Sequence, residues 1–139
     1  MNIDLDRIRE LFAADRFAAG AGAVIVSVTE DLVQCEMAVT GNHRNAGGGV
    51  QGGAIFTLAD FAFGVHCNLD LVCGKDVGQT VGQSCAISFL KNTRGTRLTA
   101  KSTCISKGRR ISVFRVAVED DLGVLIAEMH GNAFTKDKV

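Results

Sequence analysis

The chain has 139 residues, of which 47% are hydrophobic, and its 15 acidic and 15 basic residues leave no formal net charge. This size and apolar content suit one domain with its own core, which we expect to span residues 1–139. The balanced charge argues against a nucleic-acid surface, and Trp and Tyr, which would stack on bases, are absent. The longest apolar stretch is too short to cross a bilayer and is interrupted by Asp60, so we expect no membrane partner.

The cysteines predict neither a disulfide framework nor a zinc site, because their number is odd and no two form a C-x-x-C pair. They are Cys35, Cys67, Cys73, Cys85 and Cys104. The N-terminus is acidic and polar, unlike a signal peptide. We therefore expect a cytoplasmic protein with reduced thiols and no metal.

The first third of the chain combines one helix with two strands. Apolar residues recur at helical spacing over residues 4–18, which predicts an amphipathic helix. Alternation of apolar and polar residues over 23–40 then predicts a hairpin that turns at Glu30 and Asp31. Residues 41–49 contain four glycines and are expected to form a loop.

The remainder predicts one long helix followed by strands. Residues 51–68 are apolar on nearly every side of a helix, which must therefore be covered on most sides. After a break near residues 75–78, alternation predicts four strands, at residues 79–90, 96–106, 110–119 and 123–135. The order predicts an α+β fold in which a curved antiparallel sheet of about six strands wraps the central helix, with an N-terminal helix beside it.

One stripe of the central helix differs from its other faces. It consists of Gly53, Thr57, Asp60, Gly64 and Asn68, which are small or polar, whereas the other positions are bulky and apolar. The stripe is either a narrow strip facing solvent or the lining of a subunit interface that contains a site. A solvated face would normally carry Lys, Glu or Gln, and this one carries none.

The start of that helix offers a second reactive element. Gly52 leaves its backbone N–H uncovered at a helix N-terminus, where it could polarise a carbonyl oxygen, although glycine there could simply permit a tight turn. Gly52 and Asp60 are eight residues apart, which on a straight helix is about 12 Å. If both act on one substrate, they come from different copies of the chain, and this predicts an obligate dimer with two equivalent sites.

The motif Asn45, Gln51-Gly52-Gly53 and Leu58-Ala59-Asp60 resembles the hotdog-fold acyl-CoA thioesterases, in particular the PaaI-like and THEM2-like subgroup. The resemblance covers residues 20–135, including the strand at 86–90 and the later hairpins. It implies a hotdog fold, an acyl-CoA substrate, no separate cofactor, and dimers that often pair into dimers of dimers.

The resemblance also implies roles for individual residues. Asp60 would be the catalytic carboxylate, as general base or nucleophile, and the Gly52 amide, helped by Asn45, would polarise the thioester carbonyl of the other subunit's site. The substrate-binding residues implied by the motif, the stripe and the basic turn are Gln51, Gly53, Thr57, Gly82, Ser84, Lys107 and Arg109, the last two for the phosphates of coenzyme A.

Two positions depart from the family pattern. Gln51 replaces the usual His and cannot titrate, so any acid–base role there is lost. Gly82 stands where the family often has Ser or Thr on the strand facing Asp60, and Thr80 or Ser84, which share its alternation, are candidate substitutes.

We therefore expect an acyl-CoA thioesterase acting on a small aromatic or short- to medium-chain acyl group. The alternatives are a non-hydrolytic acyl-CoA-binding or regulatory protein of the same fold, a hotdog hydratase or dehydratase, and a structural domain without a ligand. A hydratase or dehydratase would need a histidine beside the acidic group. We expect His43, His66 and His130 to be non-catalytic, which argues against this hypothesis.

Overall fold

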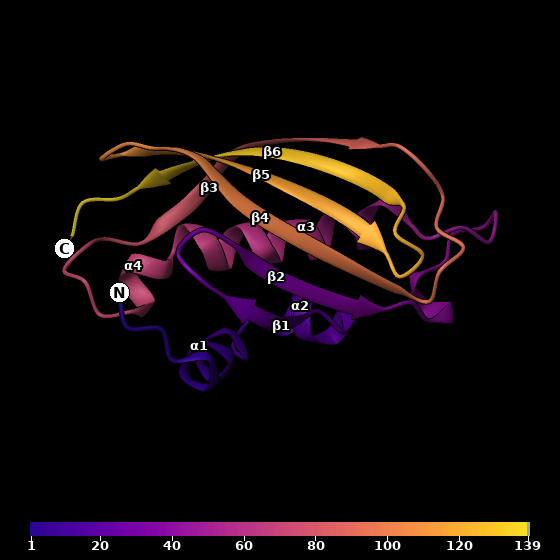
Figure 1. Ribbon diagram of the computed structural model, residues 1–139, viewed down its shortest axis with the longest axis horizontal. Helices are drawn as coiled ribbons and strands as arrows, with labels where there is room; N and C mark the ends of the chain where they lie inside the picture. Colours follow the sequence, from indigo (N-terminus) through magenta and orange to yellow (C-terminus); the bar gives the residue numbers. More distant parts are fainter. Residues whose placement is uncertain (139) are drawn as a thin grey trace.

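The computed structural model describes residues 1–138 and shows a curved six-stranded sheet wrapped around the long helix α3, Gly52–Cys67 (Figure 1). The strands are β1 Val24–Val28, β2 Val33–Ala38, β3 Thr80–Phe89, β4 Arg97–Lys107, β5 Ile111–Asp120 and β6 Leu125–Thr135. Their order in the sheet is β1-β2-β4-β5-β6-β3, and all neighbours are antiparallel. The expected α+β layout is confirmed, with the predicted central helix and last four strands correct to within two residues.

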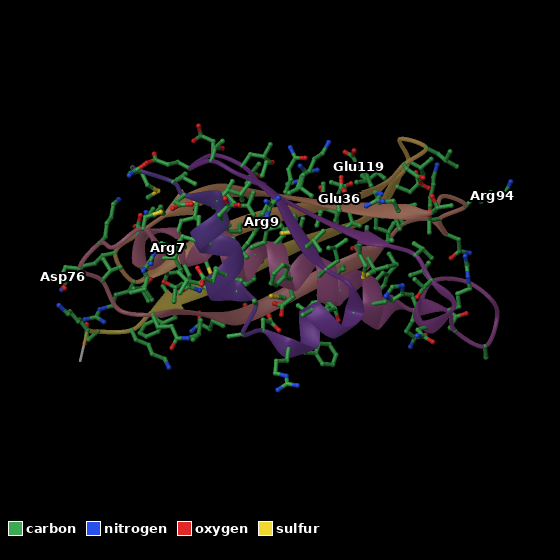
Figure 2. All side chains as sticks on the ribbon, turned by 90° about the horizontal axis from the view of Figure 1, so that it is seen from below. Arg7, Arg9, Glu36, Asp76, Arg94 and Glu119 are labelled. Carbon is green, nitrogen blue, oxygen red and sulfur yellow. The ribbon has the colours of Figure 1, made fainter. Side chains whose placement is uncertain are left out.

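The N-terminal segment forms two helices, so the single helix expected over residues 4–18 is wrong. Helix α1 spans Leu5–Phe12 and helix α2 spans Arg16–Ala21. Asp15 separates them because its backbone is not helical and its carboxylate accepts the Ala18 N–H at 3.0 Å, which makes it the N-cap of α2. Figure 2, viewed from the side of these helices, shows both in front of α3.

Two short elements were not predicted. A 3₁₀ turn, Gly41–His43, lies inside the glycine-rich loop region, and helix α4, Leu69–Val72, follows α3 directly. No helix within residues 1–138 is long and apolar enough to span a membrane. Both ends of the described chain lie at the same end of the molecule, beside α4 (Figure 1).

The core forms between α3 and the concave face of the sheet. Leu58, Ala59, Ala62 and Val65 of the helix are fully buried there, and each large apolar side chain removed from water contributes about 1.5–3 kcal/mol. The stripe described above is the least covered part of α3, because Gly53 and Asp60 are exposed and its other members are half-buried. The sheet therefore covers the apolar faces of α3 and leaves the stripe accessible.

The ring of Phe63 packs against two glycines of adjacent strands. A Cβ atom added to Gly131 of β6 would lie 3.0 Å from the Phe63 Cζ atom, and one added to Gly82 of β3 would lie 3.2 Å from Cε2. Phe63 is almost completely buried, so its ring has little room to move. Glycine at position 131 is thus required by the packing of this ring.

We expect Gly131→Ala to destabilise the fold by about 1–3 kcal/mol, because the added methyl group overpacks a rigid core. Urea unfolding followed by circular dichroism measures this change. Gly20→Ala is the matched control, because nothing lies within 4 Å of its added Cβ and alanine favours the helix. Equal stability of the Gly131 variant and the wild type would contradict the packing argument.

Candidate active site

The glycine-rich loop before α3 is closed by the side chain of Asn45. Its Oδ1 accepts the N–H groups of Gly47 at 3.0 Å and Gly49 at 3.1 Å, while its backbone N–H donates to the Gly49 carbonyl at 2.8 Å. Gly48 adopts a φ of +84°, which only glycine tolerates easily. The side-chain oxygen of Asn45 therefore shapes the loop. Its exposed side-chain NH₂ group is the part that can donate to a ligand.

The first two amides of α3 remain available as donors. Gln51 holds the entry to the helix, donating its N–H to the His43 carbonyl at 2.7 Å and accepting the Ala54 N–H at 2.9 Å. Within residues 1–138, the N–H groups of Gly52 and Gly53 donate to no acceptor, and no side chain caps the helix. A helix N-terminus in this state carries partial positive charge and binds an anionic oxygen.

Gly52 also makes room for an aromatic ring. A Cβ atom at this position would lie 3.1 Å from Cζ of Phe89, the last residue of β3. Phe89 is 53% exposed, so its ring covers the helix N-terminus on one side without being locked in the core. The Gly52 amide thus lies beside an aromatic wall, with its glycine allowing the close approach.

Asp60 lies in the middle of α3 and lines a cleft of about 420 Å³. The cleft has walls from the N-terminal segment, from α3 and from β3. The lining residues are Phe12, Asp15, Phe17, Ala18, Phe56, Thr57, Asp60, Phe61, Phe63, Gly64, Cys67, Thr80 and Gly82. This is a mostly apolar pocket with a carboxylate in it, the usual form of a small-molecule site.

The surroundings of Asp60 change its acidity. The cleft walls remove part of the water around its carboxylate, and the Asp15 carboxylate lies close enough to repel it; both effects raise the pKa of Asp60, desolvation being the larger. The side chain nevertheless remains exposed at the cleft mouth. An accessible carboxylate with a raised pKa is a stronger base than an ordinary surface aspartate.

Thr57 and Gly53 share the stripe with Asp60. The Thr57 Oγ1 donates to the Gly53 carbonyl oxygen at 2.7 Å, so its hydroxyl proton is used inside the helix and its lone pairs remain for a ligand. Thr57 lines the cleft, whereas Gly53 and Gln51 lie at the helix start, outside it.

Strand β3 brings Gly82 and Thr80 into the cleft but not Ser84. A bulge between Gly82 and Ser84 inserts one extra residue, and Ser84 pairs with Asn132, whose Nδ2 donates to its Oγ at 3.2 Å. Gly131 and Ala133, the neighbours of Asn132 in β6, are buried and face the core, whereas Asn132 is exposed. The expectation that Ser84 shares the face of Gly82 is wrong, because the bulge reverses the alternation of side chains.

The same bulge turns Cys85 toward the helix, and sequence reasoning missed this residue. Cys85 pairs with Gly131, the residue under the Phe63 ring, so it points to the concave side. Burial, followed by the nearby Asp60 carboxylate, raises the pKa of the Cys85 thiol. Cys67 has a pKa of about 12, mainly because of burial. Both thiols beside Asp60 are therefore neutral near pH 7.

Lys107 and Arg109 line a second pocket, of about 310 Å³, at the C-terminal end of α3. Lys107 Nζ lies 2.5 Å from Asp70 Oδ2, and Lys75 Nζ lies 3.0 Å from the other oxygen of the same carboxylate. The walls of this pocket and of the Asp60 cleft share Cys67 and Thr80, so the two hollows adjoin. The basic turn therefore lies next to the cleft, at the end of α3 that is farther from Gly52.

The histidines make structural contacts. His43 contacts the Ala21 carbonyl through Nε2 at 2.6 Å and accepts the Thr40 N–H at Nδ1. His66 bonds the Glu30 carbonyl and Ser102 Oγ, at 2.8 Å and 3.0 Å, and its burial lowers its pKa. His130 lies on the exposed face of β6. None of the three lines the Asp60 cleft.

One chain does not bring the two predicted reactive elements together. Gly52 and Asp60 lie on the same straight helix, about 12 Å apart along its axis. One thioester carbonyl is too small to contact both. The structure thus presents two candidate half-sites, a donor at the helix start and a carboxylate in the cleft.

Comparison with known proteins identifies the family. The profile of the Thioesterase superfamily matches residues 47–127. A protein of Deinococcus radiodurans, described as a candidate esterase, is 32% identical over 88% of this chain and 80% of its own length. The acyl-coenzyme A thioesterase PaaI of Escherichia coli is 27% identical over 88% of this chain and 84% of its own.

The fold is shared with solved structures. A thioesterase from Haemophilus influenzae superposes with a TM-score of 0.87 at 20% identity, covering 99% of this chain and 93% of that one. The hotdog fold expected from the sequence motif is confirmed. The family match includes both candidate half-sites, since residues 47–127 contain Gly52, Asp60 and most of the later strands. The chain belongs to the Thioesterase superfamily and is a hotdog-fold thioester hydrolase.

Proposed function

We propose that the protein is an acyl-CoA thioesterase whose active site is completed by two chains, with Asp60 from one and the Gly52 amide from the other. The observation that carries the proposal is the pair of half-sites: a partly desolvated carboxylate in an apolar cleft and two unsatisfied amides about 12 Å away along the same helix. PaaI of Escherichia coli, named as an acyl-coenzyme A thioesterase, supports the substrate class.

The reaction follows from these groups. The Gly52 N–H of the second chain donates to the thioester carbonyl oxygen, and the Asn45 amide group assists it. Asp60 takes a proton from water as the water oxygen attacks the carbonyl carbon. The C–S bond then breaks, the carbonyl reforms, and the thiolate of coenzyme A receives the proton from Asp60. In the alternative mechanism, Asp60 attacks the carbonyl carbon itself, the C–S bond breaks to release coenzyme A as its thiolate, and water then hydrolyses the mixed anhydride to the free acid and regenerates Asp60.

The edge strand β3 offers the surface for the second chain. It is the terminal strand of the sheet, and its central residues 82–86 are exposed. Exposed edges pair readily with another strand, and a two-fold axis at this edge would bring the stripes of two α3 helices side by side in opposite directions. We infer a homodimer of this kind, and a pair of dimers as the larger assembly.

The substrate would extend from the cleft into the basic pocket. Lys107 and Arg109 would hold phosphates of coenzyme A, with the pantetheine arm passing Cys67 and Thr80, which line both hollows. The acyl group would lie among the phenylalanines of the cleft, which suits small aromatic and short- to medium-chain groups. Acyl-CoA chemistry and five free thiols suit the cytoplasm.

A thiol-release assay tests the proposal. Aromatic, short-chain and long-chain acyl-CoAs are each incubated with the protein, and free coenzyme A is measured alongside the mass of the particle by light scattering. We expect turnover of aromatic or short to medium substrates by a dimer or larger assembly. An active monomer would refute the shared site, and no thiol release from any acyl-CoA would refute the activity.

One observation favours a second candidate, a non-hydrolytic acyl-CoA binder. Gln51 makes no capping hydrogen bond and cannot titrate, so the donor side of the site has no acid–base group. Such a protein would bind intact acyl-CoA with the affinity it shows for a non-hydrolysable analogue and would release no thiol. Isothermal titration with both ligands separates it from an enzyme.

A further inference from the structure

We propose that Asp15 is a positioning residue of the hydrolytic site, which acts through Asp60 by setting the pH range over which Asp60 serves as a base. Both carboxylates line the same cleft, one from the N-cap of α2 and the other from the middle of α3. This inference rests on the proposed function.

Asp15 is held in place by its local structure. Its carboxylate accepts the Ala18 N–H at 3.0 Å, and Ala18 is only 3% exposed against the core. The other end of α2 is fixed by His43, whose Nε2 lies 2.6 Å from the Ala21 carbonyl oxygen. Because both ends of this short helix are anchored, the Asp15 charge keeps a fixed position relative to the cleft.

Asp15 is the charged residue that shares the lining of the cleft with Asp60. Among the cleft-lining residues within 1–138, only Asp15 and Asp60 carry charge. The other titratable groups near Asp60 are the thiols of Cys67 on α3 and Cys85 on β3, and burial raises the pKa of both, which keeps them neutral. Replacing Asp15 therefore removes the one charge that accompanies Asp60 in the described lining of this cleft.

The direction of the effect follows from repulsion between like charges. The Asp15 carboxylate disfavours the ionised form of Asp60 and so raises its pKa, in addition to the larger effect of desolvation. A base with a higher pKa accepts the proton of water more readily, but it is ionised only at higher pH. Removing the Asp15 charge lowers the Asp60 pKa and extends activity toward acid.

The test is the pH dependence of kcat/KM for Asp15→Asn. Asparagine caps a helix as well as aspartate does, so α2 is retained while the charge is lost. We expect the acid limb of the profile to move to lower pH by more than the fitting error. An acid limb that stays in place would overturn the proposal.

Asp4→Asn is the matched control. Asp4 caps α1 in the same way, accepting the Arg7 N–H at 3.2 Å, but it does not line the cleft. We expect its acid limb to coincide with that of the wild type. If both variants shift the limb equally, the effect comes from total charge, and the role of Asp15 is refuted.

A readout independent of activity is the carboxyl ¹³C signal of Asp60, assigned by its loss in Asp60→Asn and titrated in the wild type and in Asp15→Asn. We expect the midpoint to fall when Asp15 is neutral, and an unchanged midpoint would overturn the inference. If Asp60→Asn keeps full activity, the proposed function fails whatever this titration gives. If Asp60→Asn is inactive and the midpoint is unchanged, only the role of Asp15 fails.

Discussion

Replacing Asp60 by asparagine is expected to lower kcat for thioester hydrolysis at least about a hundredfold, because an amide of the same shape cannot accept the proton of the attacking water. The assay is the release of free coenzyme A under saturating acyl-CoA. Within residues 1–138 Asp60 forms no ion pair, and its pKa is raised in the folded chain, so its loss should leave stability near pH 7 unchanged or increased.

The fold and assembly of this variant are the controls. Thermal unfolding should show a melting temperature at or above that of the wild type, and light scattering should give the same mass. A variant with these properties and low activity has lost chemistry alone. Full activity of Asp60→Asn on a good substrate would remove Asp60 from the mechanism.

The second large effect is expected from Gly52→Pro, which removes the proposed oxyanion donor. Proline lacks the N–H and is tolerated at the first position of a helix, and Gln51 already has the extended backbone, φ −60° and ψ 133°, that a following proline requires. Loss of one such donor typically lowers kcat by about 10²–10³. Steady-state kinetics with the best substrate measure the loss.

Gly52→Ala separates the donor from the added bulk. It keeps the N–H but places a methyl group 3.1 Å from the Phe89 ring, which is half-exposed and can shift. We expect this variant to retain activity within about tenfold of the wild type. If alanine and proline reduce kcat equally, the crowding of Phe89 rather than the missing N–H explains the loss.

The same two inactive variants also test whether the site is shared between chains. In a mixed dimer of Asp60→Asn and Gly52→Pro, one site carries both defects and the other carries none. Random reassociation of equal amounts should therefore restore about a quarter of the wild-type activity. Mixtures that stay inactive under conditions of subunit exchange would contradict the two-chain site.

The parts of the fold set by hydrophobic periodicity could be predicted from the sequence. Only a helix buries the apolar side chains around Leu58, and only strands bury the alternating ones after residue 79. Both elements were predicted. The candidate carboxylate was also readable, because Asp60 interrupts an otherwise apolar helix.

The helix break at Asp15 and the bulge in β3 could not be predicted from the same hydrophobic patterns. Asp15 lies inside a run with helical spacing, yet its side chain caps a new helix there and brings a second carboxylate to Asp60. The bulge before Ser84 reverses which face of the sheet each later side chain of β3 points to. Cys85, rather than Ser84, therefore faces the helix. Neither event changes the hydrophobic pattern, so only the structure reveals them.

The place of Met1 in the fold matters for work with recombinant protein. Met1 and Thr135 both line the pocket that contains Lys107 and Arg109, and the Met1 amino group lies 3.5 Å from Glu30. A flexible segment fused to Met1 would therefore start beside this pocket, where a polyhistidine tail or an acidic linker would compete for the proposed phosphate-binding residues. Dissociation constants should be measured after the tag has been cleaved.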